Sequence, residues 1–126
     1  MRIFKTKWVA RFVRRERISD ADLKEAIERA ERGLIDADLG GGLIKQRVAR
    51  PGQGRSGGLR MIVAYRAEDR AFFLYGFAKS ERENIDDDEL QTLRDIAAEF
   101  LANDDTALDE AVSIGKLQEI ENGEDA

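Results

Sequence analysis

A glycine-rich stretch between two strand-like runs is the feature that most constrains the fold of this chain. Residues 43–60 have the sequence LIKQRVARPGQGRSGGLR, in which a loop from Pro51 to Gly58 separates the two runs. This pattern predicts a β-hairpin whose glycine-rich backbone can approach a ligand closely. The hairpin carries five cations and no carboxylate: Lys45, Arg47, Arg50, Arg55 and Arg60. Such a surface is suited to an anion, and phosphate is the natural candidate.

The composition limits the chemistry that is open to this chain. Its 126 residues, of which 42% are hydrophobic, predict one small globular domain. The absence of cysteine and histidine removes disulfides, thiolate metal sites and the commonest general base. No apolar run approaches the roughly 18 residues of a membrane span, and the basic N-terminus lacks the apolar centre of a signal peptide. We expect a cytoplasmic protein without membrane contact, metal or cofactor, whose catalysis would depend on Lys, Arg, Tyr, Ser or carboxylates.

The net charge of −5 conceals a strong asymmetry along the chain. Residues 1–79 contain 18 Lys and Arg against 10 Asp and Glu, whereas residues 80–126 contain 3 against 16. Because charges are screened over about 8 Å in physiological salt, a local basic surface can bind phosphate even in an acidic protein. The overall acidity is therefore no argument against nucleic acid.

Apolar periodicity predicts an opening strand followed by two helices. Residues 2–5 have strand character, and the helical spacing of apolar residues 8–13 predicts a short amphipathic helix in which Trp8 anchors the core. Ser19 is expected to cap a second helix that stops at Gly33. The N-terminal part of the chain is thus a strand and a helical hairpin.

The middle of the chain predicts a sheet that is antiparallel from its second strand on. The expected strands cover residues 34–39, 43–49, 59–66 and 71–78. In the last of these, regular alternation places Phe72 on one face and Phe73, Tyr75 and Phe77 on the other. Both faces are then apolar, as in a central strand that helices cover.

The acidic C-terminal part predicts one long helix and two short elements. Four successive acids at residues 86–89 favour a helix start, because negative charge is stabilising there. Residues 106–112 are expected to form a short helix, and residues 116–120 an edge strand or a segment that docks on a partner. We assign residues 1–103 to the main domain and residues 104–126 to an acidic extension that packs in part and frays at its end. As a hypothesis, this extension folds near the basic hairpin or binds a partner.

Strand periodicity places the candidate catalytic residues on one surface. Lys45 and Arg47 point to the same face of their strand because side chains alternate along a strand. Arg60 opens the next strand and lies near this pair if the two runs are paired. The end of the last strand brings Lys79 and Arg82 to the same region. The five cations are expected to line one concave surface on which no acid intervenes.

A phosphate site of this composition suits RNA better than DNA, because the 2′-OH of RNA supplies the nucleophile. Arg47 and Arg60 can clamp phosphate and stabilise the charge of a phosphorane, but arginine cannot accept the proton of the 2′-OH. A lysine among arginines has its cationic form disfavoured, so Lys45 is the candidate base and Lys79 the second choice. The alternative is an ordinary solvated strand face, since the loop precedes a strand and is not a Walker A sequence.

Further RNA contacts are expected from the loop and from the aromatic strand. RNA-binding proteins use aromatic side chains as stacking platforms, which makes Tyr75, or else Tyr65, a candidate for stacking on a base. The remaining candidates for phosphate binding are Arg50, Arg55, Ser56, Gly57 and Gly58.

The order of these motifs resembles a known family. Residues 39–66, LGGGLIKQRVARPGQGRSGGLRMIVAYR, followed by residues 72–85, FFLYGFAKSERENI, resemble the RelE/ParE superfamily of type II toxin–antitoxin toxins and look like its HigB-type branch. The resemblance implies an α+β fold similar to small microbial RNases, mainly an antiparallel sheet with two N-terminal helices and a C-terminal helix. It also implies a toxin that cuts mRNA in the ribosomal A site and so inhibits translation.

The resemblance also implies roles for residues of this chain. The basic strand pair of the family corresponds to Lys45 and Arg47, the phosphate-clamping arginine to Arg60, and the strand-end cations to Lys79 and Arg82. All five are therefore our candidate catalytic residues.

A departure from the family pattern leaves two alternatives open. Several relatives place a tyrosine or histidine shortly after the last strand, where this chain has Asn84 and Ile85. The identity of the general acid and base stays open, as do a ParE-like toxin that poisons gyrase and a non-enzymatic module that binds nucleic acid or protein. As partners the family implies a small helix-turn-helix antitoxin encoded in the adjacent gene and ribosome-bound mRNA, with a monomeric toxin in isolation.

Overall fold

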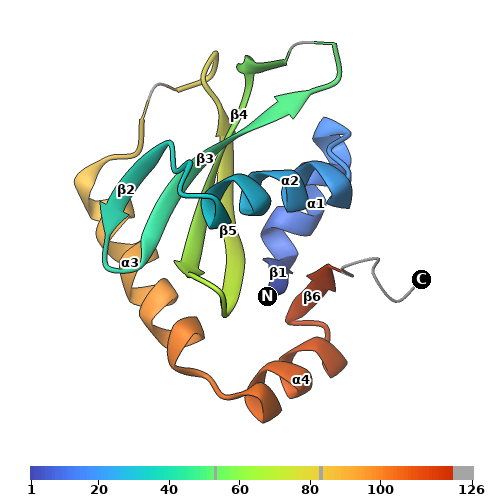
Figure 1. Cartoon of the computed structure of the whole chain (residues 1–126), viewed down its shortest axis with the longest axis vertical. Coiled ribbons are helices and arrows are strands. Elements are labelled where there is room, and N and C mark those ends of the chain that lie inside the picture. The colour runs from blue at the N-terminus through green and yellow to red at the C-terminus, as the bar shows by residue number, and fades with distance from the viewer. Residues whose placement is uncertain (53, 83, 121–126) are drawn as a thin grey trace.

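A six-stranded sheet forms the middle layer of the computed structural model, with helices on both of its faces (Figure 1). The structure describes residues 1–52, 54–82 and 84–120, and it describes residues 54–57 by their backbone alone. In chain order the elements are β1 (Arg2–Thr6), α1 (Lys7–Glu16), α2 (Asp20–Glu31), β2 (Ala37–Gly40), β3 (Leu43–Arg50), β4 (Gly54–Arg66), β5 (Arg70–Ala78), α3 (Asp87–Ala102), α4 (Asp105–Ser113) and β6 (Leu117–Ile120).

The strand order is β2-β3-β4-β5-β1-β6. Strands β2 to β5 pair antiparallel in sequence order, β1 runs parallel to β5, and β6 closes the far edge antiparallel to β1. The predicted α+β class and the antiparallel pairing from the second strand on are confirmed. No helix in the described part of the chain is both long enough and apolar enough to cross a bilayer.

The two N-terminal helices cover one face of the sheet (Figure 1). The Ser19 hydroxyl accepts the N–H of Asp22 and caps α2 as predicted, and the Asp22 carboxylate accepts the N–H of Ser19 in return. Helix α1 lies against β5 at a glycine, because a β-carbon on Gly76 would meet the Phe12 ring at 2.7 Å. The missing side chain therefore lets this helix approach the sheet closely.

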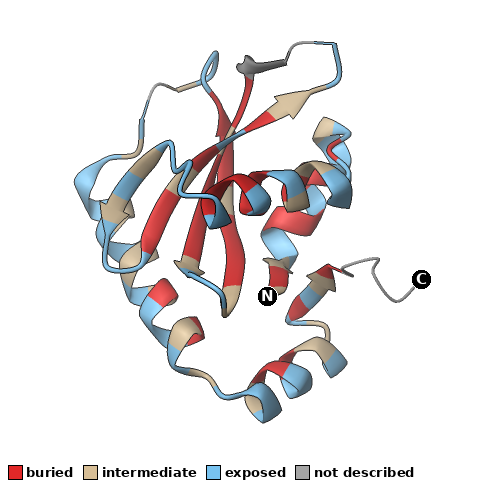
Figure 2. Ribbon diagram, viewed as in Figure 1, coloured by how far each residue is buried: buried red, intermediate tan, exposed pale blue. Residues whose placement is uncertain are grey.

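The opposite face is covered by α3 and α4, and buried residues of both faces form two cores (Figure 2). Stacked rings of Phe4, Phe72 and Phe100 link the sheet to α3, with centroid separations of 5.1 and 5.0 Å. Asp86 caps α3 by accepting the N–H of Glu89, as the run of acids predicts. The stacked rings therefore hold the last part of α3 against the first half of β5.

The acidic segment after residue 103 lies at the edge of the sheet far from the hairpin. Helix α4 leads into β6, which pairs with β1, so the edge-strand expectation is confirmed. The hypothesis that this segment folds near the basic hairpin is wrong for its described residues, because its acids form ion pairs with Arg2 and Arg70 instead. Residues 121–126 lie outside the described part of the chain.

The second strand begins later than predicted, at Ala37 instead of Leu34. The N–H of Leu34 donates to the carbonyl of Arg29 at the end of α2. This hydrogen bond is possible because Gly33 has a φ of 82°. The side chain of Gln46 then accepts the N–H of Asp36 and donates to the carbonyl of Leu34. Residues 34–36 are thus held by a helix end and a side chain instead of a strand ladder.

The hairpin loop is shorter than predicted, because β4 begins at Gly54 and not at Leu59. Gly54 pairs with Arg50 across a register shift, so the ladder continues into the region that sequence alone assigns to the loop. The expected turn at the other end of β3 is confirmed: Gly40, Gly41 and Gly42 have φ values of 81°, 64° and 83°. Three successive left-handed residues require glycine.

Candidate functional site

Strand pairing places two arginines directly opposite each other. Arg47 of β3 is the cross-strand partner of Arg60 of β4, and Arg60 in turn faces Phe77 of β5. Directly opposed side chains have β-carbons about 4.5–5.5 Å apart, and like charges at that spacing destabilise a sheet. Lys45 lies two residues before Arg47 on the same face, opposite Ile62. The predicted proximity of Lys45, Arg47 and Arg60 is confirmed.

Arg60 has an unsatisfied group at this position. Its Nη1 atom is buried and has no hydrogen-bond partner within the described part of the chain. A buried donor without a partner costs about 1–3 kcal/mol, and more when the group is charged. Combined with the like-charged neighbour Arg47, this geometry destabilises the isolated protein. An anion placed between the two guanidinium groups would offset their like charges.

Arg47 is held by the carboxylate of Asp36, the residue directly before β2, which is the strand that pairs with β3. The carboxylate of Asp36 accepts two hydrogen bonds from Arg47. The backbone N–H donates to one oxygen at 2.7 Å, and the guanidinium Nη2 donates to the other at 3.2 Å. Asp36 itself is fixed by the buried Gln46 and lies 3.4 Å from the nearly buried Arg29. Burial opposes ionisation of Asp36, but the hydrogen bonds from Arg47 and the charges of both arginines lower its pKa below the ordinary value. The network orients Arg47 before any ligand binds.

Arg82 is held at the end of β5 by groups that follow it in sequence. Its Nη1 lies 3.1 Å from the carboxylate of Glu89, and its Nε donates to the carbonyl of Asn84 at 2.9 Å. The hydrogen bond from Arg82, together with the N–H of Asp86, lowers the pKa of Glu89 to about 2. The same Nη1 lies 3.5 Å from the hydroxyl of Tyr75. Arg82 is thus positioned, and it is also partly neutralised.

Tyr75 faces the basic surface because β5 contains a bulge. The register between β4 and β5 shifts between Ile62 and Val63, which face Tyr75 and Phe73 respectively. The predicted alternation is therefore wrong: Tyr75 and Phe77 lie on the face of Phe72 and not on that of Phe73. Together with three residues of α3, Tyr75 lines a hollow of about 220 Å³; these residues are Glu89, Thr92 and Leu93.

The second tyrosine candidate lies on the other side of the sheet. Tyr65 packs with the core under α1 and α2, and its hydroxyl donates to Glu31. Burial, followed by this hydrogen bond, raises the pKa of Tyr65 above its ordinary value. Of the two tyrosines, only Tyr75 is placed where it could stack on a base at the basic face.

The two lysines differ from the arginines in their surroundings. Lys45 is half-buried and Lys79 is exposed just after the end of β5. Within residues 1–52, 54–82 and 84–120, neither side chain forms an ion pair or a hydrogen bond. Both amines are therefore available to a ligand.

The loop candidates lie at the start of β4. Gly58 is buried in the strand, whereas Arg55, Ser56 and Gly57 are described by their backbone alone. Arg50, at the end of β3, lies 3.0 Å from Glu16 at the end of α1.

The expectation that no acid reaches the basic surface is wrong. Asp36, Glu16 and Glu89 each approach one of the predicted cations, although none of these acids belongs to the hairpin. Sequence reasoning missed them because they come from the loop after α2, the end of α1 and the start of α3. A weak signal existed only for Glu89, which occupies the N3 position of a predictable capping box.

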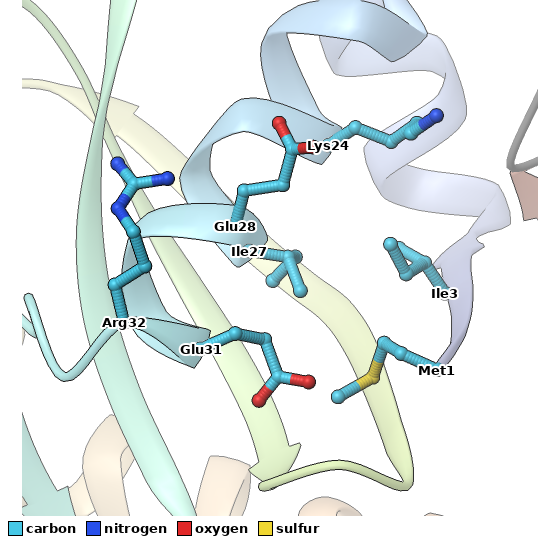
Figure 3. A pocket seen from close by; sticks show the side chains of 7 residues that line it. All are labelled: Met1, Ile3, Lys24, Ile27, Glu28, Glu31 and Arg32. Carbon is cyan, nitrogen blue, oxygen red and sulfur yellow. The ribbon is translucent and has the colours of Figure 1, made fainter.

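A second hollow of about 380 Å³ lies on the α2 side of the sheet (Figure 3). Its apolar floor comes from Met1, Ile3 and Ile27, and its rim mixes Lys24 and Arg32 with acids of α2. One of these acids, Glu31, bonds to the backbone of the turn between β4 and β5, at the end of the sheet remote from the hairpin tip. This hollow is therefore separate from the basic surface.

Comparison with known proteins gives one family. Residues 1–120 match the model of a family described as the RelE toxin of the RelE / RelB toxin-antitoxin system. No curated protein sequence matches the chain significantly. The family match includes β6 and α4 as well as the hairpin.

Proposed function

We propose that this chain, which belongs to the RelE toxin family and is the toxin of a toxin–antitoxin system, is an endoribonuclease that cuts mRNA in the ribosomal A site. Its partner of that system is an antitoxin. The proposal extends to a cytoplasmic, HigB-type toxin whose antitoxin is a helix-turn-helix protein encoded in the adjacent gene.

The opposed pair Arg47 and Arg60 carries this proposal. The pair combines like charges with a buried, unpartnered Arg60 Nη1, and a bound phosphate group would offset the like charges. Arginine binds phosphate oxygens in a bidentate manner, and its charge stabilises a phosphorane more than a ground-state diester. A site that is strained without its anion supports phosphate chemistry better than a merely solvated strand face does.

The proposed reaction uses the nucleophile that RNA carries. The 2′ oxygen forms a bond to the adjacent phosphorus, the bond from phosphorus to the 5′ oxygen breaks, and a 2′,3′-cyclic phosphate and a 5′-OH result. Lys45, in its neutral form, accepts the proton of the 2′-OH, while Arg60 and Arg47 hold the non-bridging oxygens. Lys79 and Arg82 approach the leaving-group side, where Lys79 can supply a proton to the 5′ oxygen.

Recognition of the base and ordering of the strand complete the proposal. Tyr75 presents a ring beside the small hollow at α3, and Arg50 with the residues at the start of β4 contacts flanking phosphates. Each proton-transfer group contributes about 10²- to 10⁴-fold, so the isolated site is a modest catalyst. The ribosome supplies the missing part by holding mRNA in a fixed geometry.

Primer extension on ribosome-bound mRNA tests this function. Wild type should cut within the A-site codon, and Arg60→Ala and Lys45→Ala should each lower the cleavage rate by about 10²-fold or more at matched folding. Arg32→Ala, an exposed cation at the end of α2, is the control and should cut like wild type. Intact mRNA with wild type would overturn the proposal and favour gyrase poisoning, which a supercoiling assay on the same preparations detects.

A further inference from the structure

Trp8 is not the core anchor that its helical spacing predicts. Its side chain is 40% exposed, although it lies at the start of a helix whose next apolar residues are buried. The indole stacks on the Phe12 ring with a centroid separation of 5.1 Å. It also lies against the Tyr75 ring, with a centroid separation of 4.6 Å. Strand β1 pairs with β5 only as far as Phe73, so Trp8 lies beside the part of β5 that β1 leaves uncovered. An exposed aromatic side chain held this rigidly is a preformed platform.

The solvent face of α1 around Trp8 is strongly basic. Its exposed cations are Lys7, Arg11, Arg14 and Arg15, and Arg17 follows directly after the helix. The helix contains one acid, Glu16, which is mostly buried and bonds to Arg50 at 3.0 Å. Arg15 lies 4.0 Å from this acid and also over the ring of Phe12 at 5.7 Å. The field of this face is therefore positive along its whole length.

A hollow of about 320 Å³ opens on this face. Its lining is Trp8 and Phe12 together with the guanidinium groups of Arg11 and Arg15. The volume is at the low end of the range for small-molecule pockets, about 300–1,000 Å³. Aromatic rings bordered by arginines suit a nucleobase, which stacks on both kinds of planar group, with its phosphates on the neighbouring cations.

Each end of α1 contacts one residue that is proposed to bind RNA. At the N-terminal end Trp8 contacts Tyr75, whose hydroxyl is near Arg82. At the C-terminal end Glu16 bonds to Arg50 of the hairpin. Helix α1 packs on the face of the sheet opposite to Arg60, and at each of its ends it contacts a residue that the proposed function assigns to RNA.

We propose that α1 forms a second RNA-binding surface, in which the hollow at Trp8 takes one unpaired base and Arg11, Arg14 and Arg15 bind the phosphates beside it. The inference rests on the proposed function, which it extends from the cleaved nucleotides to flanking single-stranded RNA. Single-stranded RNA fits better than a duplex, because only an unpaired base offers its ring to the hollow.

The test measures RNA affinity without cleavage. The probe is a fluorescein-labelled 2′-O-methyl RNA of about ten nucleotides, which has no free 2′-OH and matches the site sizes of single-strand binders. Anisotropy reports binding, and quenching of Trp8, the single tryptophan of the chain, reports contact at the hollow. The variant is Arg11→Gln/Arg15→Gln; the control, Arg32→Gln/Lys116→Gln, removes two exposed cations away from α1.

We expect saturable quenching of Trp8 and about tenfold weaker binding by the α1 variant than by the control. The slope of log affinity against log salt should fall by about 0.7 for each lost phosphate contact. Equal affinity of variant and control, or Trp8 emission unaffected by saturating RNA, would overturn the inference. If wild type fails to cut mRNA but the α1 variant still loses affinity, the proposed cleavage function fails and the binding surface stands.

Discussion

Arginines oppose one another at two places in the described part of the sheet, one of which also includes Arg66 of β4 opposite Arg70, and they are neutralised to very different degrees. Arg2 of β1 faces Arg70 of β5, just as Arg47 of β3 faces Arg60 of β4. Arg2 contacts three carboxylates, at 2.7 Å from Asp109, 2.9 Å from Glu119 and 3.1 Å from Asp105. Its hydrogen bond with Glu119, above all, raises the pKa of Arg2.

The other pair has a single acid for two cations. Asp36 serves Arg47, whereas Arg60 has no ion pair within the described residues and keeps a buried Nη1 without a partner. The acidic C-terminal segment thus neutralises the arginines at one edge of the sheet and leaves those of the hairpin uncovered. Opposed arginines are therefore compensated or left without acids depending on which acids the fold brings to them.

The largest expected effect is on RNA cleavage, and it comes from replacing Arg60. Arg60→Met retains the apolar part of the side chain and removes the guanidinium. We expect ribosome-dependent cleavage to fall by about 10²-fold or more, with stability unchanged or higher, because an unpartnered buried donor and a like-charge contact disappear. Single-turnover cleavage and urea unfolding measure the two effects. A loss of stability together with retained cleavage would make Arg60 a structural residue.

Within the described residues, Asp36 is the one acid that forms an ion pair with the opposed arginines Arg47 and Arg60. Asp36→Asn should lower the free energy of unfolding by about 1–3 kcal/mol near neutral pH, because the buried Arg29 and the exposed Arg47 both lose an ion pair.

The effect of Asp36→Asn should depend on pH in one direction. The folded-state pKa of Asp36 is depressed, so the unfolded state binds protons more readily as the pH falls. The stabilisation by Asp36 is complete above its ordinary pKa of 3.8 and is lost as the pH falls through the lower folded value. Urea unfolding of wild type and variant should converge in acid; a difference that persists there would contradict the assignment.

Arg2→Met is the corresponding substitution at the arginine pair that the acidic C-terminal segment neutralises. Removing the cation leaves Asp105, Asp109 and Glu119 close together without it, so stability should fall by about 1–2 kcal/mol, since two of these acids are well exposed and screened. Cleavage per folded molecule should equal that of wild type. Loss of cleavage at full folding would erase the distinction between the two pairs.

The smallest expected effect concerns the cation that is only partly neutralised. Glu89→Gln keeps the size of the side chain and frees Arg82 from its carboxylate. Because exposed ion pairs are weak, we expect RNA affinity to rise only about two- to fivefold. Thr92→Ser, next to Glu89 at the same hollow, is the matched control. Weaker binding by Glu89→Gln would mean that Glu89 positions Arg82 instead of masking it.

Much of the fold was predictable because its signals are local. The cap at Ser19, the helix start in the acids at residues 86–89 and the glycine turn at residues 40–42 each depend on a few neighbouring residues, and the structure confirms them. The approach of Arg60 to Lys45 and Arg47 was predictable too, because pairing across a short loop fixes the register of a hairpin.

The parts that sequence reasoning missed depend on contacts between distant elements. The bulge in β5 moves the side chains of Tyr75 and Phe77 to the opposite face of the sheet from the one that regular alternation predicts. The alternating pattern of the sequence does not indicate where a bulge occurs. Trp8 has the spacing of a core residue, yet it lies beyond the end of the β1 ladder and is exposed. In both places a single irregularity of the sheet overrides a regular pattern.

The sequence by itself determined the α+β class, the helix limits set by caps, and the concentration of cations on one hairpin, because propensity, capping and alternation act over a few residues. Tertiary structure alone decided which of those cations stay uncompensated. Glu16 reaches Arg50 only once α1 is packed on the sheet, Asp36 reaches Arg47 through the pairing of β2 with β3, and Glu89 reaches Arg82 where α3 begins after β5. Electrostatic energy depends on distance in space, and for residues far apart in the chain that distance is set by the fold.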